Sequence, residues 1–374
     1  MYVEVLPGEG SGDRQRHSAV WALRLVRVSA PLTPDSQAEV NFIRCLLRAG
    51  ATTSFAIRYM CYGAQDGAAP SVALLCRVTS QNDAQDARRQ AMIMAEQVQA
   101  ILSSFSPAHH WRPVEDAAEF ARIWRPLDWS QAHFAEIRRR EELVDVHEPS
   151  SDPDACPEGN TGVYLVRPFA ARDSSARPLQ LMMHHRAPLM LQVSFSPTQL
   201  LDHELQHFRR EIAASCWSDS LASRDEFSTG QPNDPRRFIF IYATAIQFML
   251  LNQLLRLQAA AVLTSICVAS TDPLPLMLVQ AIGADLIGPP GEEVGAGNIA
   301  SGRLLRGCFD LLIPENSESI AAARQNASEL TFCSWGHSIA PKISRRLRYL
   351  LDPVEAASVF RFPAAADTVS CDDV

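Results

Sequence analysis

Hydrophobic and polar residues alternate with a period of two over two neighbouring stretches, 54–62 and 71–79. Phe55, Ile57 and Tyr59 share one face of the first stretch, and the residues between the two stretches include Gly and Pro. A period of two bounded by turn residues predicts a β-hairpin. By the same rule, and by the helical spacing of apolar residues elsewhere, the first part of the chain contains further elements. The expected strands there cover 2–6 and 20–28, and the expected helices cover 35–50, 80–105, 115–124 and 128–144.

Strand and helix patterns also alternate in the second part of the chain. Ser196 and Pro197 suit the N-cap and first position of a helix, and Asp352 and Pro353 repeat this signal near the C-terminus. The helix expected over 236–261 is apolar on most faces, which is typical of a buried helix. The expected strands cover 163–169, 188–195, 262–269 and 304–313, and the other expected helices cover 196–214, 273–287, 317–330 and a short segment from 353.

The order of these elements predicts an α+β fold made of two α/β-sandwich halves with mainly antiparallel sheets. Residues 148–162 are rich in Asp, Pro, Ser and Gly, which is typical of a domain boundary. We therefore expect one half at 1–147, a linker at 148–162, a second half at 163–363 and a flexible acidic tail at 364–374. A Leu-Leu-Arg tripeptide precedes a strand in each half, so a diverged duplication is one hypothesis for their origin.

The composition excludes some classes of protein. The chain has 374 residues, of which 47% are hydrophobic and 20% charged, as in ordinary globular proteins. Its net charge of −8 argues against a dominant basic surface for nucleic acid, although a local basic patch stays open. None of the nine cysteines forms a CxxC pair and no secretory signal is recognisable, so we expect a cytoplasmic protein. The most apolar run, 238–251, is shorter than the roughly 20 residues of a membrane span.

The sharpest short motif is HELQH at 203–207. On a helix, HExxH places two imidazoles one turn apart, with a carboxylate beside them that can activate a zinc-bound water. One hypothesis is therefore a zinc-dependent peptidase. In it Glu204 is the catalytic base, and His203, His207 and Glu226 are the zinc ligands.

The neighbours of this motif disfavour a metal. Arg209 and Arg210 follow it closely, and positive charge repels a divalent cation. Glu211 extends the same helix face but lies too close along one helix to complete a tetrahedron. The competing interpretation is a solvent-exposed helix face, with both histidines pointing away from a buried stripe of apolar residues made of Leu201, Leu205, Phe208 and Ile212. The pattern alone leaves both open.

Other candidate motifs are less specific. The Gly-rich stretch 288–297 carries two glutamates and no Lys followed by Ser or Thr, so we expect a flexible surface loop. Neither GxxxxGK[ST] nor GxSxG occurs in the sequence. The charge run 138–142 is interpreted as a solvated helix face. Arg345, Arg346 and Arg348 could contact nucleic acid or an acidic chain, but three arginines are too few to indicate this, and a solvated helix face is the preferred interpretation.

Several segments together resemble the non-catalytic N-terminal region of HerA–FtsK superfamily ATPases. The stretch VSFSPT at 193–198, followed by Glu204, is similar to a strand and helix of that region. The stretch AEIRRRE at 135–141 is similar to a segment between its two halves. DPVEAASVFRFP at 352–363 resembles the bridge into the motor domain and is the most specific of the three. The resemblance spans about residues 20–363.

The resemblance implies a module for oligomerisation or partner docking, in DNA translocation, conjugation, secretion or defence. It implies self-association, with a hexamer as the expected assembly, and an ATPase motor domain or another protein as partner. ATP and Mg²⁺ belong to the motor domain of that family, so without a Walker A motif no nucleotide-binding residue is carried over. The chain would be the N-terminal part of a longer ATPase or a stand-alone relative that lost its motor. A stand-alone cytoplasmic scaffold is a further hypothesis, and direct binding of nucleic acid stays open.

Overall fold

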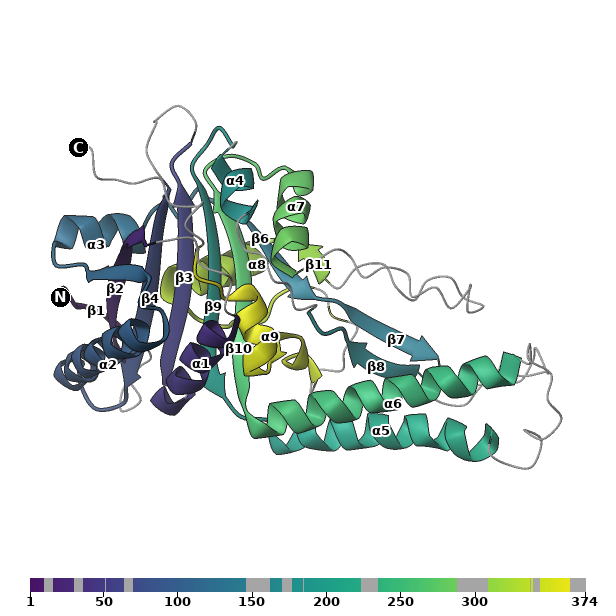
Figure 1. Ribbon diagram of the computed structural model, residues 1–374. Coiled ribbons are helices and arrows are strands. Elements are labelled where there is room, and N and C mark those ends of the chain that lie inside the picture. The colour runs from purple at the N-terminus through teal and green to yellow at the C-terminus, as the bar shows by residue number, and fades with distance from the viewer. Residues whose placement is uncertain are drawn as a thin grey trace.

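The fold is known from a computed structural model (Figure 1). It describes residues 1–9, 16–29, 36–50, 52–63, 70–145, 162–169, 177–183, 185–222, 235–287, 309–336, 338 and 344–363. The expected linker at 148–162, except Gly162, the Gly-rich stretch and the acidic tail lie outside these ranges, and so does Glu226.

A ten-stranded sheet forms the body of the described chain, and its strands run in the order β1-β2-β4-β3-β9-β10-β6-β11, with β5 paired to β2 and β12 to β10. Every pairing within it is antiparallel. These strands are β1 (Glu4–Glu9), β2 (Arg16–Val28), β3 (Thr53–Cys61), β4 (Ser71–Ser80), β5 (His109–Pro113), β6 (His133–Arg139), β9 (Leu189–Thr198), β10 (Ala261–Ser270), β11 (Phe309–Leu312) and β12 (Leu350–Leu351). A separate hairpin pairs β7 (Glu141–Asp145) with β8 (Gly162–Val166). The expected α+β class with mainly antiparallel strands is confirmed.

Helices cover both faces of the sheet. The helices are α1 (Ser36–Leu46), α2 (Ala84–Phe105), α3 (Ala117–Trp124), α4 (Arg177–Met183), α5 (Asp202–Ala222), α6 (Pro235–Ala259), α7 (Leu276–Ile287), α8 (Ser317–Glu329) and α9 (Pro353–Val359). The largest apolar core joins one face of the sheet to α1, α2, α7 and α9, which lie in front of it in Figure 1. Smaller cores join the other face to α3 and α8. Since both faces are covered, the central strands are buried along nearly their whole length.

The predicted hairpin is confirmed. Strands β3 and β4 pair antiparallel, with Ile57 opposite Leu74 on the face that carries the main core. The helix expected to follow it also forms, and Asp83 is its N-cap, because its carboxylate accepts the backbone N–H of Asp86. Local pattern and capping therefore predicted this part of the chain well.

The sheet interleaves strands from the two expected halves. Strand β3 pairs with β9, and β6 lies between β10 and β11, so strands on either side of the 148–162 stretch share one set of hydrogen bonds. Within the described ranges the arrangement shows no duplication.

Two predicted elements are wrong. The helix expected over 128–144 is instead β6 followed by β7. Its alternation fits a strand, and both ends of the segment find hydrogen-bonding neighbours in β10, β11 and β8. The helix expected to begin at Ser196 starts at Asp202, because β9 continues through Thr198 to stay paired with β10. Strands β5 and β12 and helix α4 were not predicted.

A two-helix arm projects from the body. Helices α5 and α6 pack against each other along their length and extend past the β7–β8 hairpin (Figure 1). The helix expected over 236–261 is confirmed as α6, and its buried residues Ile246, Leu250 and Leu254 share a core with β8. Its expected burial on most faces is wrong, because Phe248 and Leu255 on the other side are exposed. In the described part of the chain, no helix combines the length and apolar character needed to cross a membrane.

Candidate functional site

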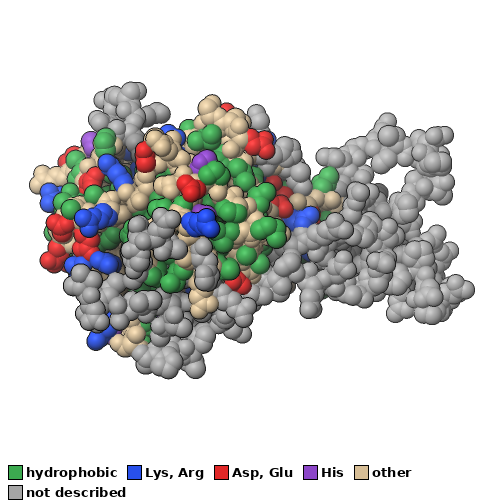
Figure 2. Space-filling view, turned by 90° about the horizontal axis from the view of Figure 1, so that it is seen from above, with side chains coloured by type: hydrophobic (Ala, Val, Ile, Leu, Met, Phe, Trp, Pro, Cys, Tyr) green, Lys and Arg blue, Asp and Glu red, His purple; other side chains and the backbone are tan. Residues whose placement is uncertain are grey.

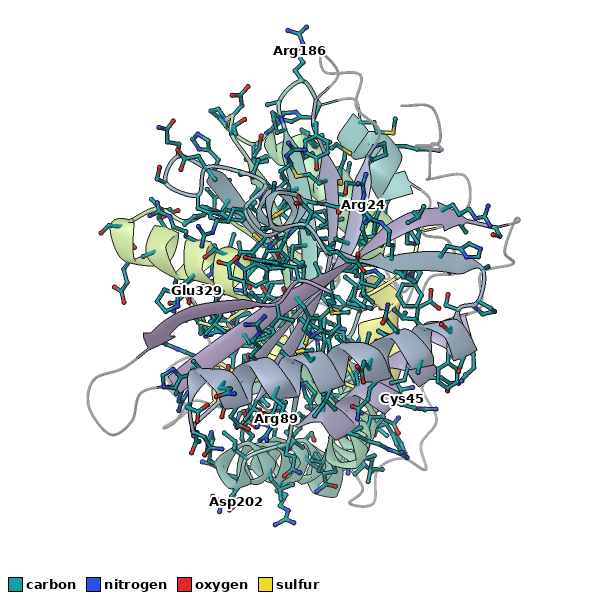
Figure 3. The ribbon with its side chains drawn as sticks, turned by 90° about the vertical axis from the view of Figure 1, so that its left-hand side faces the viewer. Arg24, Cys45, Arg89, Arg186, Asp202 and Glu329 are labelled. Carbon is teal, nitrogen blue, oxygen red and sulfur yellow. The ribbon has the colours of Figure 1, made fainter. Side chains whose placement is uncertain are left out.

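The HELQH motif lies in the first two turns of α5, near the base of the arm (Figure 3 labels Asp202, where α5 begins). The Glu204 carboxylate accepts the backbone N–H of Leu201 at 2.9 Å, which is one half of a capping box. Both oxygens of Glu204 also accept hydrogen bonds from Nη1 of Arg346, at 2.9 and 2.7 Å. Since Glu204 is fully buried, this guanidinium supplies the partner that a buried carboxylate requires.

The second histidine of the motif is also buried. Its ring lies 5.6 Å from the Tyr164 ring of β8, and Nδ1 of His207 lies 3.5 Å from a carboxylate oxygen of Glu211. Burial, helped by the charge of Arg210, lowers the pKa of His207 to about 4. His207 is therefore neutral at neutral pH. Its Nε2 has no hydrogen-bond partner among the described residues.

The expected solvent-exposed helix face is therefore wrong for Glu204 and His207. Strand β8 and the segment around Arg346 pack onto that side of α5, whereas Leu201, assigned to the buried stripe, is exposed. The sequence pattern could not show this, because both covering segments are distant along the chain.

The contacts of the motif do not favour a zinc centre. Among the described residues, no group of three His, Cys, Asp or Glu side chains could hold a metal ion. The carboxylate that would activate water is bound by Arg346 and by a backbone N–H. The remaining candidate ligand, Glu226, lies outside the described residues. The geometry thus favours a structural role for Glu204, and zinc binding stays a hypothesis for metal analysis.

The segment that resembles the bridge is seated in the main core. Asp352 caps α9 as expected, since its carboxylate accepts the backbone N–H groups of Val354 and Glu355 at 2.8 and 3.2 Å. After α9, the ring of Phe360 packs edge-on against Phe195 of β9 with centroids 4.8 Å apart. Phe362 packs against Phe42 of α1 at 5.3 Å.

Backbone contacts hold the same segment. Nε2 of His109 lies 2.8 Å from the carbonyl oxygen of Pro363, and the Tyr59 hydroxyl donates to the carbonyl of Arg361. These contacts come from β3 and β5, which precede the segment by more than 200 residues. The segment is thus tied to the sheet by its main chain as well as by its aromatic rings.

A buried ion pair fixes the start of the segment. Arg139 of β6 lies 3.3 Å from the Glu355 carboxylate and donates to the carbonyl of Leu350. Glu355 also accepts the backbone N–H of Phe169 at 2.7 Å. Burial raises the pKa of Glu355, and the charge of Arg139 opposes that rise. The Arg139 guanidinium therefore links its own strand, β6, to both β12 and α9.

The charge run 138–142 was expected to be solvated, and Arg138 and Arg139 contradict this because both are buried. The Arg138 guanidinium lies between the rings of Trp335 and Tyr349, at 5.3 and 5.2 Å from their centroids, and pairs with Glu136 at 3.0 Å. Cation–π contact and the carboxylate together offset its loss of hydration.

The C-terminal arginine cluster divides in the fold. Arg348 is buried over the Tyr349 ring at 5.1 Å and pairs with Glu141 at 3.3 Å. Arg346 holds Glu204, and Arg345 alone of the three is exposed. The expected solvated helix face is therefore wrong for Arg348, and the three arginines do not form one exposed basic face.

The sequence patterns did not indicate the burial of Arg58, Arg77 and Arg361. Arg58 of β3 donates to the Gln192 side chain and to the carbonyls of Ile123, Trp124 and Ala327, so it clamps α3 and α8 onto the sheet. Burial lowers its pKa to about 9. The available signal for Arg58 was that its neighbours on the same face of the strand, Ala56 and Met60, are apolar.

Five cysteines are free thiols, namely Cys45, Cys61, Cys76, Cys267 and Cys333. Burial raises the pKa of Cys61 and Cys267 to about 12 each, so neither is a reactive thiolate at neutral pH.

Comparison with known proteins adds no assignment: no protein-family model matches the chain, and no match is found among curated proteins.

Proposed function

We propose that the chain is a non-catalytic module of a HerA–FtsK-type ring ATPase, which self-associates and docks a partner protein. The observation that carries this proposal is the packing of residues 352–363 into the main core. These residues are the part of the sequence that resembles the bridge to the motor domain. A segment that connects two domains can hold them in a fixed relative position only if one of the domains holds its first residues rigidly. The capped α9, the Arg139–Glu355 pair and the two phenylalanines supply such a base.

The absence of GxxxxGK[ST] from the sequence supports a role without nucleotide chemistry in these residues. ATP and Mg²⁺ would be bound by the motor domain that the module serves, whether on the same polypeptide or on a partner. The module would contribute assembly and docking to DNA translocation, conjugation, secretion or defence.

The division into halves at 1–147 and 163–363 belongs to the same proposal, and so does their origin in a duplication. The shared sheet then requires that β6 of the first half was inserted between β10 and β11 of the second. Separate expression of the two halves tests this division: units that fold alone support it, and insoluble halves contradict it.

The proposed function is tested by mass and by ATP hydrolysis. The purified chain should sediment as a multiple of its 41.3 kDa mass, with a hexamer as the expected species, and should hydrolyse no ATP. A rate of ATP hydrolysis above that of a mock purification would contradict the non-catalytic role. A monomer at all concentrations up to about 100 µM would favour the stand-alone scaffold instead.

A further inference from the structure

The outer face of α6 is apolar and exposed. Phe248, Leu251 and Leu255 are 61%, 38% and 56% exposed, and their spacing places them on one side of the helix. The opposite side of α6 is already buried against α5 and β8. A helix that is apolar on both sides is typical of one packed on both sides, so this outer face has the character of a contact surface.

A groove lies between α2 and β1. It has a volume of about 1020 Å³ and extends along α2 from Asp83 to Glu96, which is roughly 20 Å of helix at 1.5 Å per residue. Val5, Met92 and Ile93 supply its apolar surface, and the latter two are 49% and 50% exposed. Apolar anchors at i, i+3 and i+7 are those by which a helix binds in such a groove.

The two surfaces cannot meet within one molecule. Helix α2 lies at one end of the body, and the arm that carries α6 extends toward the other end (Figure 1). In the end-on view, α2 with its labelled Arg89 lies in front of the sheet, and the arm lies below and behind it (Figure 3). We propose that the outer face of α6 in one copy of this chain binds the α2–β1 groove of a second copy.

The charges around the two surfaces are complementary. Arg256 stands beside Leu255 on α6 with its side chain largely exposed, and its contact with Asp352 is 3.3 Å long. Asp83 and Glu96 lie at the two ends of the groove, and the exposed guanidinium of Arg256, which pairs with Asp352 in its own molecule, is the positive charge beside the α6 face. Of the basic residues there, Arg89 is paired with Asp86 at 2.6 Å. Arg88 is the one that opposes the contact, and acidic groups outnumber basic ones in the groove.

The contact is head-to-tail, since the two surfaces differ. Repeating it adds copies in one direction and closes into a ring when the rotation between neighbours allows it. This inference rests on the proposed function, because it names the surfaces by which that self-association takes place.

The test uses the full-length chain and three aspartate variants. Phe248→Asp alters the α6 face, Ile93→Asp alters the groove, and Met277→Asp is the matched control. Met277 lies on α7 and is 77% exposed. Hydrophobic side chains are visible on the upper face of the body (Figure 2). Sedimentation should show that the first two variants fall to one chain per particle, while the control keeps the wild-type mass. Circular dichroism and thermal unfolding check that all three fold.

Mixing distinguishes this contact from others. A Phe248→Asp chain keeps an intact groove and an Ile93→Asp chain keeps an intact α6 face, so their mixture should form a two-chain particle. A mixture that stays monomeric, or variants that keep the wild-type mass, would overturn the proposed contact. If the wild-type chain assembles in that case, self-association stands without it. A monomeric wild-type chain would instead remove both this contact and the proposed self-association.

Discussion

Nε2 of His109 lies 2.8 Å from the carbonyl oxygen of Pro363, across 254 positions of the sequence. A carbonyl can only accept a hydrogen bond, so Nε2 carries the proton, and Nδ1 then accepts the hydroxyl of Ser106. Burial lowers the pKa of His109, with a smaller contribution from His110, which favours this neutral form. One imidazole therefore joins the C-terminal segment to the strand β5.

The aromatic contacts of residues 352–363 should contribute strongly to the stability of the fold. We expect Phe362→Ala to lower the free energy of unfolding by about 3–5 kcal/mol, because it removes a buried ring that contacts Phe42, His109 and Trp111. Val354→Ala is the control, since Val354 is exposed on α9 and should change stability by less than about 1 kcal/mol. Urea unfolding measures both. Equal effects of the two changes would contradict the seating of Phe362.

The Arg139–Glu355 pair should respond unequally to loss of its two members. Arg139→Met leaves Glu355 buried without its cation, so we expect a loss of about 3–5 kcal/mol in the free energy of unfolding. Glu355→Gln removes the charge but keeps an acceptor for the Phe169 backbone N–H, so it should cost less. A double-mutant cycle measures the coupling between the two sites. A loss below about 1 kcal/mol for Arg139→Met would contradict a buried role for this arginine.

Acid should destabilise the fold through His207. Its pKa is about 4 in the fold against 6.5 in the unfolded chain, so the unfolded state binds more protons between these values. The stability is fully present above pH 6.5 and is lost as the pH falls toward 4, by about 3 kcal/mol for a shift of this size.

Unfolding in urea at a series of pH values measures this effect. His207→Gln should flatten the slope between pH 4 and 6.5, and His109 should leave a residual slope of the same sign. NMR titration of the His207 ring gives an independent reading. A pKa near 6.5 for that ring would show that the fold does not bury it as described.

The Glu204–Arg346 pair separates the structural role of the motif from zinc binding. We expect protein purified without chelator to hold far less than one zinc per chain by elemental analysis. Arg346→Ala should lower the free energy of unfolding by about 3 kcal/mol, because it leaves the buried Glu204 carboxylate without its cation. One zinc per chain, lost in a His203→Ala variant, would instead support the peptidase hypothesis.

The sequence by itself determined the elements whose cause is local. Alternation with a period of two predicted β3 and β4, helical spacing predicted α2, α6 and α8, and the side chain of Asp352 predicted the cap of α9. Each depends on residues within about one or two turns of one another, so the pattern is complete in the local sequence. The α+β class follows from their order.

The tertiary structure alone decided which charges are buried. Arg139 reads as a solvated residue in a charged run, yet it is buried because its partners lie more than 200 positions away, at Leu350 and Glu355. Glu204 likewise depends on Arg346, at a separation of 142 residues. A buried charge is stable only where such partners converge on it, and their convergence is a property of the packed sheet rather than of any local pattern.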